Sequence, residues 1–243
     1  MPLRLKAFFL HLCLSGVIAL LALWLVFKLW YPAPLHTAVG VTHIFLLLLL
    51  VDVILGPLLT LLVYKVGKKT LVFDLAVIAA LQLSALGYGV WTVAEGRPAW
   101  LVFNADRFDL VRALDIDTRK LEQARPEFRQ PSWLGPRWVA AAPPSDSAER
   151  NELLFEAVQG GSDVPQRPDL YQPLADNRER VKERLYPLSE LQKFNSVDDV
   201  QSAISQWPEA DAWLPLMAHM PMVVLLRKET AYVVAVVDLR PWL

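Results

Sequence analysis

The residues with the clearest potential for chemistry are a carboxylate and a Gly-Pro pair inside a long apolar run. The run starts near His43 and ends at Lys65, and it contains Asp52, Gly56 and Pro57. At about 1.5 Å per residue, a helix of this length crosses the roughly 30 Å apolar core of a bilayer. A carboxylate midway through such a span costs about 3 kcal/mol on insertion scales. We therefore expect Asp52 to be hydrogen-bonded or to have a function.

Three interpretations of Asp52 remain open. In the first, its carboxylate has a structural role and locks two helices together through Gln82. In the second, Asp52, Gly56, Pro57 and Gln82 bind a polar group on the transmembrane helix of a partner. The third is a proton relay, which needs a chain of acids and histidines that the sequence does not contain. Pro57 removes one helical hydrogen bond and predicts a kink.

Other signatures of chemistry are missing from the sequence. It contains no HExxH, GxSxG, P-loop or CxxC motif. Three of the four histidines lie in or beside apolar runs, and His219 has no acid at a useful spacing. We therefore expect no catalytic, cofactor or metal site, and no enzyme activity.

The apolar runs predict three transmembrane helices, over residues 7–30, 42–64 and 71–94. The loop over residues 31–42 has no Lys or Arg, whereas Lys65, Lys68 and Lys69 form a basic turn between the second and third helices. The positive-inside rule therefore predicts that the N-terminus and this turn are cytoplasmic. Everything after Glu95 is then outside, in the periplasm of a Gram-negative cell.

The basic turn also predicts which side chains lie at the same depth. Asp52 precedes Lys65 by 13 residues and Gln82 follows Thr70 by 12, so we expect Asp52 and Gln82 to be level. By the same count, Thr60 is level with Asp74. Asp74 is also expected to pair with Lys68 or Lys69, or to lie at the positive N-terminal end of its helix.

Charge is concentrated after Glu95. Residues 97–243 contain 18 Lys and Arg and 22 Asp and Glu, without a basic stripe, which argues against nucleic-acid binding. The pattern predicts an α+β domain with an antiparallel sheet of about five strands. A hairpin over 222–226 and 231–239 is expected at the centre of the sheet, because its second strand is almost wholly apolar. We therefore divide the chain into a transmembrane region, 1–96, and a periplasmic domain, 97–243.

Several short motifs together carry a resemblance to a known family. The second apolar run contains Val51-Asp52 and Leu55-Gly56-Pro57-Leu58-Leu59-Thr60, and the chain closes with Asp238-Leu239-Arg240-Pro241-Trp242. Further segments are Trp30-Tyr31-Pro32-Ala33-Pro34-Leu35, Gly67-Lys68-Lys69, Asp74-Leu75-Ala76-Val77-Ile78, Arg97-Pro98 and Asp106-Arg107-Phe108. With these features over nearly its whole length, the chain resembles the type IV pilin accessory proteins of the TfpX/TfpZ kind.

The resemblance implies an inner-membrane, chaperone-like helper for one cognate type IV major pilin, needed for surface piliation. It implies no catalytic residues. A pilin awaiting assembly is a single apolar helix with its N-terminus inside and its head outside, so the topologies match. The membrane helices are expected to bind the pilin helix, and the outer domain its head. Arg240 and Trp242, like the lysines of the basic turn and Asp74, are expected to serve structure and topology.

Other protein classes remain alternatives. The main one is a membrane-anchored periplasmic ligand-binding or sensor protein, which needs a roomy pocket outside and an output element in the cytoplasm. The short cytoplasmic segments argue against signalling. An enzyme would need a pocket with convergent titratable groups. A transporter would have to function with three spans and one buried acid.

Overall fold

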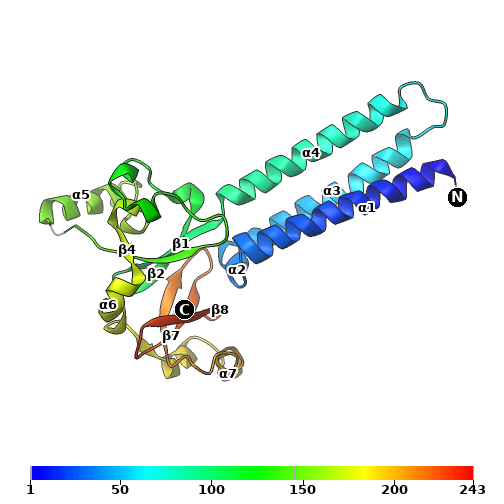
Figure 1. The fold of residues 1–243 in the computed structure, drawn as a ribbon. Helices are drawn as coiled ribbons and strands as arrows, with labels where there is room; N and C mark the ends of the chain where they lie inside the picture. The colour runs from blue at the N-terminus through cyan, green and yellow to red at the C-terminus, as the bar shows by residue number, and fades with distance from the viewer. Residues whose placement is uncertain (1, 145, 243) are drawn as a thin grey trace. The chain divides into compact units, whose positions relative to one another are not determined.

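The computed structural model describes residues 2–144 and 146–242, and it divides the chain into two compact units (Figure 1). The helical unit comprises Met1–Trp30 and Val41–Gly96, and the sheet unit comprises Tyr31–Gly40 and Arg97–Leu243. The segment 31–40, which the sequence analysis assigned to the transmembrane region, therefore belongs with the sheet unit.

Three long apolar helices make up the helical unit. Helix α1 spans Leu3–Trp24 and continues as a π-helix, η1, over Leu25–Trp30. Helix α3 spans Val41–Val63 and α4 spans Leu71–Glu95, and α3 contacts both other helices. These limits differ from the predicted ones by only a few residues. Each helix is long and apolar enough to cross a membrane.

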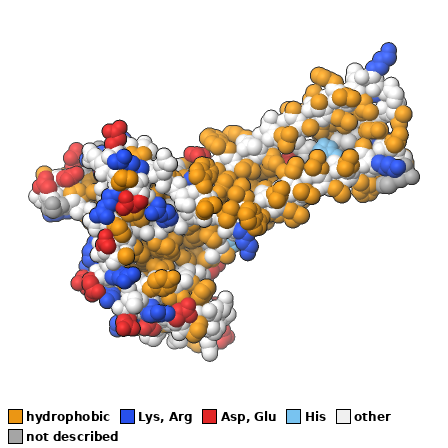
Figure 2. Space-filling model, viewed as in Figure 1, with side chains coloured by type: hydrophobic (Ala, Val, Ile, Leu, Met, Phe, Trp, Pro, Cys, Tyr) orange, Lys and Arg blue, Asp and Glu red, His pale blue; other side chains and the backbone are white. Residues whose placement is uncertain are grey.

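The surface of the helical unit is apolar. Ile44, Leu47 and Leu81 are 73%, 62% and 66% exposed. Figure 2 shows hydrophobic side chains over nearly the whole visible face of the three long helices. A helix on the surface of a water-soluble protein carries charged and polar residues on its outer face. The surface seen here is typical of helices that contact lipid or another apolar helix.

The sheet unit is built on one eight-stranded sheet. The strand order is β4-β3-β1-β2-β6-β7-β8, and β5 pairs with β6 beside this path. The strands are β1 Pro98–Asn104, β2 Arg107–Arg112, β3 Arg137–Ala141, β4 Tyr171–Pro173, β5 Tyr186–Pro187, β6 Ala212–Met217, β7 Met222–Arg227 and β8 Tyr232–Val237.

The sheet is mixed, so the prediction of an antiparallel sheet is wrong in part. Most pairs are antiparallel, but β1 pairs with β3 and β2 pairs with β6 in parallel. Parallel neighbours need a long connection that returns the chain to the same end of the sheet. The chain runs from β1 to β3 through residues 105–136 and from β2 to β6 through residues 113–211. The length of these connections in the sequence does not reveal which strands become neighbours.

The C-terminal hairpin lies at one end of the sheet, not at its centre as predicted. Strand β8 is the edge strand and pairs only with β7 among the described strands. The strand is rich in valine because both of its faces are partly covered. Val233 and Val236 pack against one hydrophobic cluster, and Val234 packs against another. Burial of two faces therefore explains a composition that we attributed to a central position.

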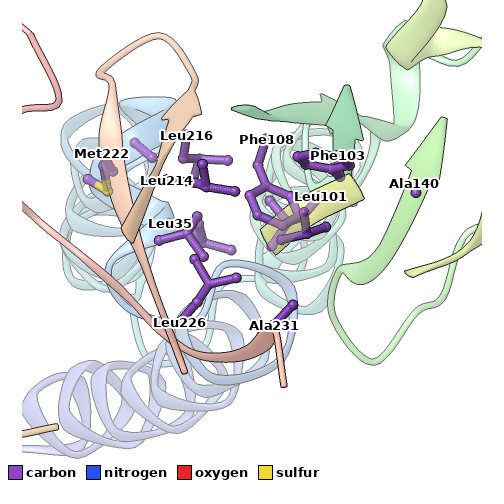
Figure 3. Packing of buried hydrophobic residues seen from close by; sticks show 13 residues of the cluster. Leu35, Leu101, Phe103, Phe108, Ala140, Leu214, Leu216, Met222, Leu226 and Ala231 are labelled. Atoms are coloured by element: carbon purple, nitrogen blue, oxygen red, sulfur yellow. The ribbon is translucent and has the colours of Figure 1, made fainter. Parts of the chain in front are cut away.

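The segment 31–40 completes the hydrophobic core of the sheet unit. It contains the short helix α2, Leu35–Val39, in which Leu35 and Ala38 are buried. Leu35 lies in one cluster with Leu101, Leu214 and Leu226, as Figure 3 shows. The N–H of Met220 donates to the carbonyl of Ala38 at 2.9 Å. This segment is therefore an integral part of the sheet unit.

Helices of the sheet unit are short. α5 spans Ser147–Val158, with Asp146 accepting from the first-turn N–H groups, and α7 spans Val197–Ser205, capped by Ser196. α6 covers only Arg178–Lys182. The 3-10 helices are η2 Ala113–Asp115, η3 Leu121–Gln123, η4 Pro126–Phe128, η5 Val164–Gln166, η6 Pro168–Leu170, η7 Leu174–Asn177 and η8 Leu188–Lys193.

Candidate helix-docking groove

A groove of about 470 Å³ runs between α3 and α4 in the helical unit. Its walls are aliphatic, with Leu47, Val51 and Leu55 among the α3 residues and Leu81 among those of α4. Among the described residues that line it, only Asp52 and Gln82 are polar. The groove therefore offers an apolar surface with one carboxylate and one amide.

Gln82 connects the three long helices. Its side-chain Nε2 donates to the main-chain carbonyl of Asp52 on α3 at 2.8 Å and lies 3.3 Å from the Ser15 hydroxyl on α1. The structure thus brings Asp52 and Gln82 to one level, as the residue counting predicted. This hydrogen bond goes to the backbone of Asp52, and the expected contact with its carboxylate stays a prediction.

Gly56 makes room for the Gln82 amide. A Cβ at Gly56 would lie 1.9 Å from Gln82 Oε1, which is closer than a real Cβ contact permits. Oε1 itself is buried and has no hydrogen-bond partner within the described part of the chain. Gly56 therefore has a packing role toward Gln82, beyond its expected effect on helix shape.

Pro57 lies inside α3, which continues through it to Val63. Because proline has no N–H, the carbonyl four residues before it, on Val53, loses its usual helical donor. Gly56 and Pro57 are both buried in the helical unit. The sequence predicted a kink here, and the structure places the pair within one continuous helix.

Asp52 lines two cavities. It lines the groove, and it also lines a smaller cavity of about 90 Å³ together with His11 and Ser15 of α1. An ionised carboxylate here can accept hydrogen bonds from a donor on a neighbouring helix, and a protonated one can donate. Both the structural and the docking interpretation of Asp52 are compatible with this position.

A second polar contact between helices was missed by the sequence analysis. His11 Nδ1 lies 2.6 Å from the Thr60 hydroxyl, and Thr60 is buried. The expected match in depth between Thr60 and Asp74 stays a prediction, and the Thr60 hydrogen bond joins α3 to α1. The available signal was the spacing of His11 and Ser15, which at i and i+4 share one face of α1.

The charged residues at the basic turn between α3 and α4 are arranged largely as expected. Lys68 Nζ lies 2.7 Å from the Asp74 carboxylate, which also accepts from Thr70 at 3.1 Å. Lys65 and Lys69 are exposed. At the other end of the chain, Arg240 binds the carbonyl of Pro221 and the carboxylate of Asp238.

Asn195 forms two hydrogen bonds with the backbone of Arg240 in the C-terminal Leu-Arg-Pro-Trp motif. Its Oδ1 accepts from the Arg240 N–H at 2.7 Å, and its Nδ2 donates to the Arg240 carbonyl at 2.8 Å. Trp242 is half-buried. No group of three or more His, Cys, Asp or Glu residues in the described ranges is arranged to hold a metal ion. The groove remains the candidate site.

Comparison with known proteins identifies the family. The model of the family "Fimbrial assembly protein FimB" matches residues 1–40. The fimbrial assembly proteins of Dichelobacter nodosus serogroups E1 and I are each 33% identical over 236 residues, which cover 93% of this chain and 91% of theirs. The protein of serogroups C1 and C2 is 35% identical over 116 residues, which cover 47% of this chain and 88% of its own. No solved structure matches the chain significantly.

The similarity to the first two relatives extends over nearly the full length of both chains, and therefore over both structural units. It agrees with the resemblance to pilin accessory proteins that the motifs in α3 and at the C-terminus indicated. This chain belongs to the fimbrial assembly protein family.

Proposed function

We propose that this chain is an inner-membrane accessory protein of type IV pilus assembly that binds one cognate major pilin. In this proposal the pilin's transmembrane helix occupies the α3–α4 groove, and the sheet unit contacts the pilin head. Membership of the fimbrial assembly family supports the role in pilus assembly. The groove supports the mode of binding.

The shape of the groove is the observation that carries the proposal. Its α3 lining recurs every three or four residues: Ile44, Leu47, Val51, Leu55 and Leu59. At 1.5 Å per residue this row is about 22 Å long. An apolar surface of this length, following one helix face, fits another helix better than it fits a compact ligand.

The two polar side chains provide selectivity within the groove. A carboxylate or amide facing lipid is costly, whereas one facing a polar group on a partner helix is stabilised. Asp52 and Gln82 therefore favour a partner that carries a polar group at their level. A purely aliphatic helix would leave both side chains without a hydrogen-bond partner in the groove. The resulting difference in binding free energy discriminates between partner helices.

The topology of the proposal follows from the distribution of basic residues. Arg4 and Lys6 lie at the N-terminal end of α1, and the basic turn joins α3 to α4, so these segments are assigned to the cytoplasm. The sheet unit is then periplasmic. A pilin has the same orientation, with its helix in the membrane and its head outside.

Site-specific photo-crosslinking in cells that express the pilin tests the groove. Leu55 lines the groove and is 51% exposed, whereas its neighbour Ile54 is 44% exposed and does not line it. A photoreactive residue at position 55 should capture pilin, and one at position 54 should capture mainly lipid. Equal capture at both positions, or at neither, contradicts the proposal.

Replacement of the carboxylate tests the role of Asp52. If the docking interpretation is correct, Asp52→Ala lowers pilin co-purification and surface piliation while the protein stays folded and membrane-bound. Unchanged co-purification and piliation would leave Asp52 with a structural role only.

A hollow in the sheet unit favours one second candidate, a periplasmic ligand-binding protein. The hollow is about 710 Å³ and has a mixed lining that includes Trp207, Asp199 and Arg240. Its volume is in the usual range for small-molecule sites. Ser202 is an exposed residue of its lining, so we expect Ser202→Trp to fill the hollow without disturbing the core. Loss of piliation in this variant, with pilin crosslinking at position 55 retained, would support the second candidate.

A further inference from the structure

Three exposed apolar side chains of the sheet unit lie near Arg97, the second residue after α4. Leu114 is 51% exposed, Trp133 is 59% exposed and Leu134 is 78% exposed. Large apolar side chains grouped on a surface indicate contact with another apolar phase. We call Leu114, Trp133 and Leu134 the apolar rim.

Two contacts tie the apolar rim to Arg97. The Arg97 guanidinium carbon lies 4.0 Å from the centroid of the Trp133 ring. The N–H of Ala113, the residue before Leu114, donates to the Arg97 carbonyl at 2.9 Å. Arg97 is only 3% exposed, so it is a fixed part of the sheet unit. The apolar rim therefore lies close to the point where α4 enters this unit.

The position of Arg97 in the chain limits how far the rim can be from the membrane. Helix α4 ends at Glu95, and consecutive Cα atoms are about 3.8 Å apart, so the Arg97 Cα lies within roughly 8 Å of the helix end. The headgroup layer adds about 5 to 8 Å on each side of the apolar core of a bilayer. For a membrane-spanning α4, the Arg97 backbone is therefore at the level of the headgroups, and the Trp133 ring stacks on the side chain of this residue.

The loop that carries Trp133 and Leu134 is ordered by its own sequence. Pro131 and Pro136 flank it, and Gly135 adopts a φ of 116°, which favours glycine. The Leu134 N–H donates to the Ser132 hydroxyl at 3.0 Å. The two apolar side chains are therefore presented without a large loss of chain entropy on binding.

The composition around the loop fits an anionic lipid surface. The segment 125–137 has three exposed arginines, Arg125, Arg129 and Arg137, and one acidic residue, Glu127, in a region that is acidic overall. Tryptophan is enriched at membrane–water interfaces, and basic residues near them are attracted to anionic headgroups.

We propose that Leu114, Trp133 and Leu134 insert into the headgroup layer of an anionic bilayer and hold the sheet unit against the membrane. This inference rests on the membrane setting proposed above for the helical unit. A second exposed apolar patch, formed by Leu154, Phe155 and Val158 on α5, provides a comparison within the same unit.

Fluorescence quenching by spin-labelled lipids tests the proposal on the full chain. In a Cys13→Ala background, single cysteines at Leu134 and Leu114 are labelled with an environment-sensitive dye, and the protein is reconstituted into phosphatidylglycerol-containing vesicles. Lipids labelled near the headgroup should quench both dyes more strongly than lipids labelled deep in the acyl chain. A dye at Val158, which is 85% exposed, should not be quenched.

A dye at Leu47 on α3 separates the two proposals. Quenching at position 47 without quenching at 134 and 114 overturns the anchor and leaves the membrane helices intact. Absence of quenching at position 47 overturns the membrane setting, and the anchor with it. An unquenched dye at 134 whose emission shifts only when pilin is added would identify a protein interface and would also overturn the lipid anchor.

Discussion

Gly56 and Gln82 approach each other so closely that a methyl group on Gly56 would lie 1.9 Å from Gln82 Oε1. The approach is possible because Gly56 has no side chain. It allows the Gln82 amide to reach the Asp52 carbonyl at 2.8 Å and the Ser15 hydroxyl at 3.3 Å. One glycine on α3 therefore permits a hydrogen-bonded connection through all three long helices.

Gly56→Ala is predicted to break this connection. The new methyl group displaces the Gln82 amide, and we expect the free energy of unfolding in detergent to fall by about 1 kcal/mol, the scale of interhelical hydrogen bonds in membranes. Gly87→Ala on α4 is the matched control, because a Cβ there meets nothing within 4 Å. In a Gln82→Ala background, Gly56→Ala should no longer be destabilising. A similar loss in both backgrounds would show that the contact with Gln82 is not the cause.

Leu35→Ala is predicted to destabilise the sheet unit, although Leu35 lies between α1 and α3 in the chain. Leu35 is 3% exposed within the main hydrophobic cluster, and comparable core truncations cost about 2 to 5 kcal/mol. Chemical unfolding followed by near-ultraviolet circular dichroism measures the effect. Leu114→Ala, at a site that is 51% exposed, should change the free energy of unfolding by less than about 0.5 kcal/mol. Equal effects of the two variants would contradict the packing of α2 in the core.

Asp109→Asn is predicted to stabilise the sheet unit at neutral pH. Burial raises the pKa of the Asp109 carboxyl, against the opposing effect of Arg107, and its Oδ2 has no hydrogen-bond partner among the described residues. A carboxyl whose pKa is raised in the folded state costs stability when it is ionised. This cost appears as the pH rises from the pKa of the unfolded chain through that of the folded state. We expect a gain of about 1 kcal/mol at pH 7 that disappears in acid. Asp106→Asn, at the exposed turn, is the control.

Asp117 is predicted to have the opposite pH dependence. Hydrogen bonds from Arg119, with Nη2 at 2.5 Å from Oδ2, hold the pKa of the Asp117 carboxyl well below its ordinary value. This contribution to stability is complete above the pKa of the unfolded chain and is lost as the pH falls toward the folded-state pKa.

The measurement compares unfolding of the wild type and Asp117→Asn between neutral and acidic pH. We expect the variant to lose about 2 kcal/mol at pH 7 and to show a flatter acid dependence. Glu179→Gln removes a pair with Lys182 in which the Glu179 side chain is 82% exposed, and it should have an effect below about 1 kcal/mol. If the free energy of unfolding falls in parallel for the wild type and Asp117→Asn as the pH is lowered, Asp117 is not the source of the acid dependence.

Much of the helical unit could be predicted from the sequence because its signals are local. Apolar runs ended by Pro32, by the lysine turn and by Arg97-Pro98 define the helices to within a few residues. The depth of Asp52 and Gln82 followed from counting residues on either side of the turn. The acceptor of the Gln82 hydrogen bond could not be predicted, because it is a backbone carbonyl whose exposure depends on how α3 and α4 pack.

The arrangement of the sheet was less predictable because strand pairing is not local. Strand β6 is apolar and contains Pro215, and it was not recognised as a strand. Its parallel pairing with β2 depends on a connection of many residues. Leu35 and Ala38 lie three residues apart on one helical face, which was a signal for burial. We treated residues 31–42 as a loop between two membrane helices, because prolines end the first helix there.

The inclusion of residues 31–40 in the sheet unit means that the chain passes between the two units at three covalent junctions: after Trp30, before Val41 and before Arg97. The core of the sheet unit therefore combines a segment that precedes α3 with strands that follow α4. During synthesis this core cannot close until the residues after Gly96 have been made, so α3 and α4 are complete before the sheet unit can fold.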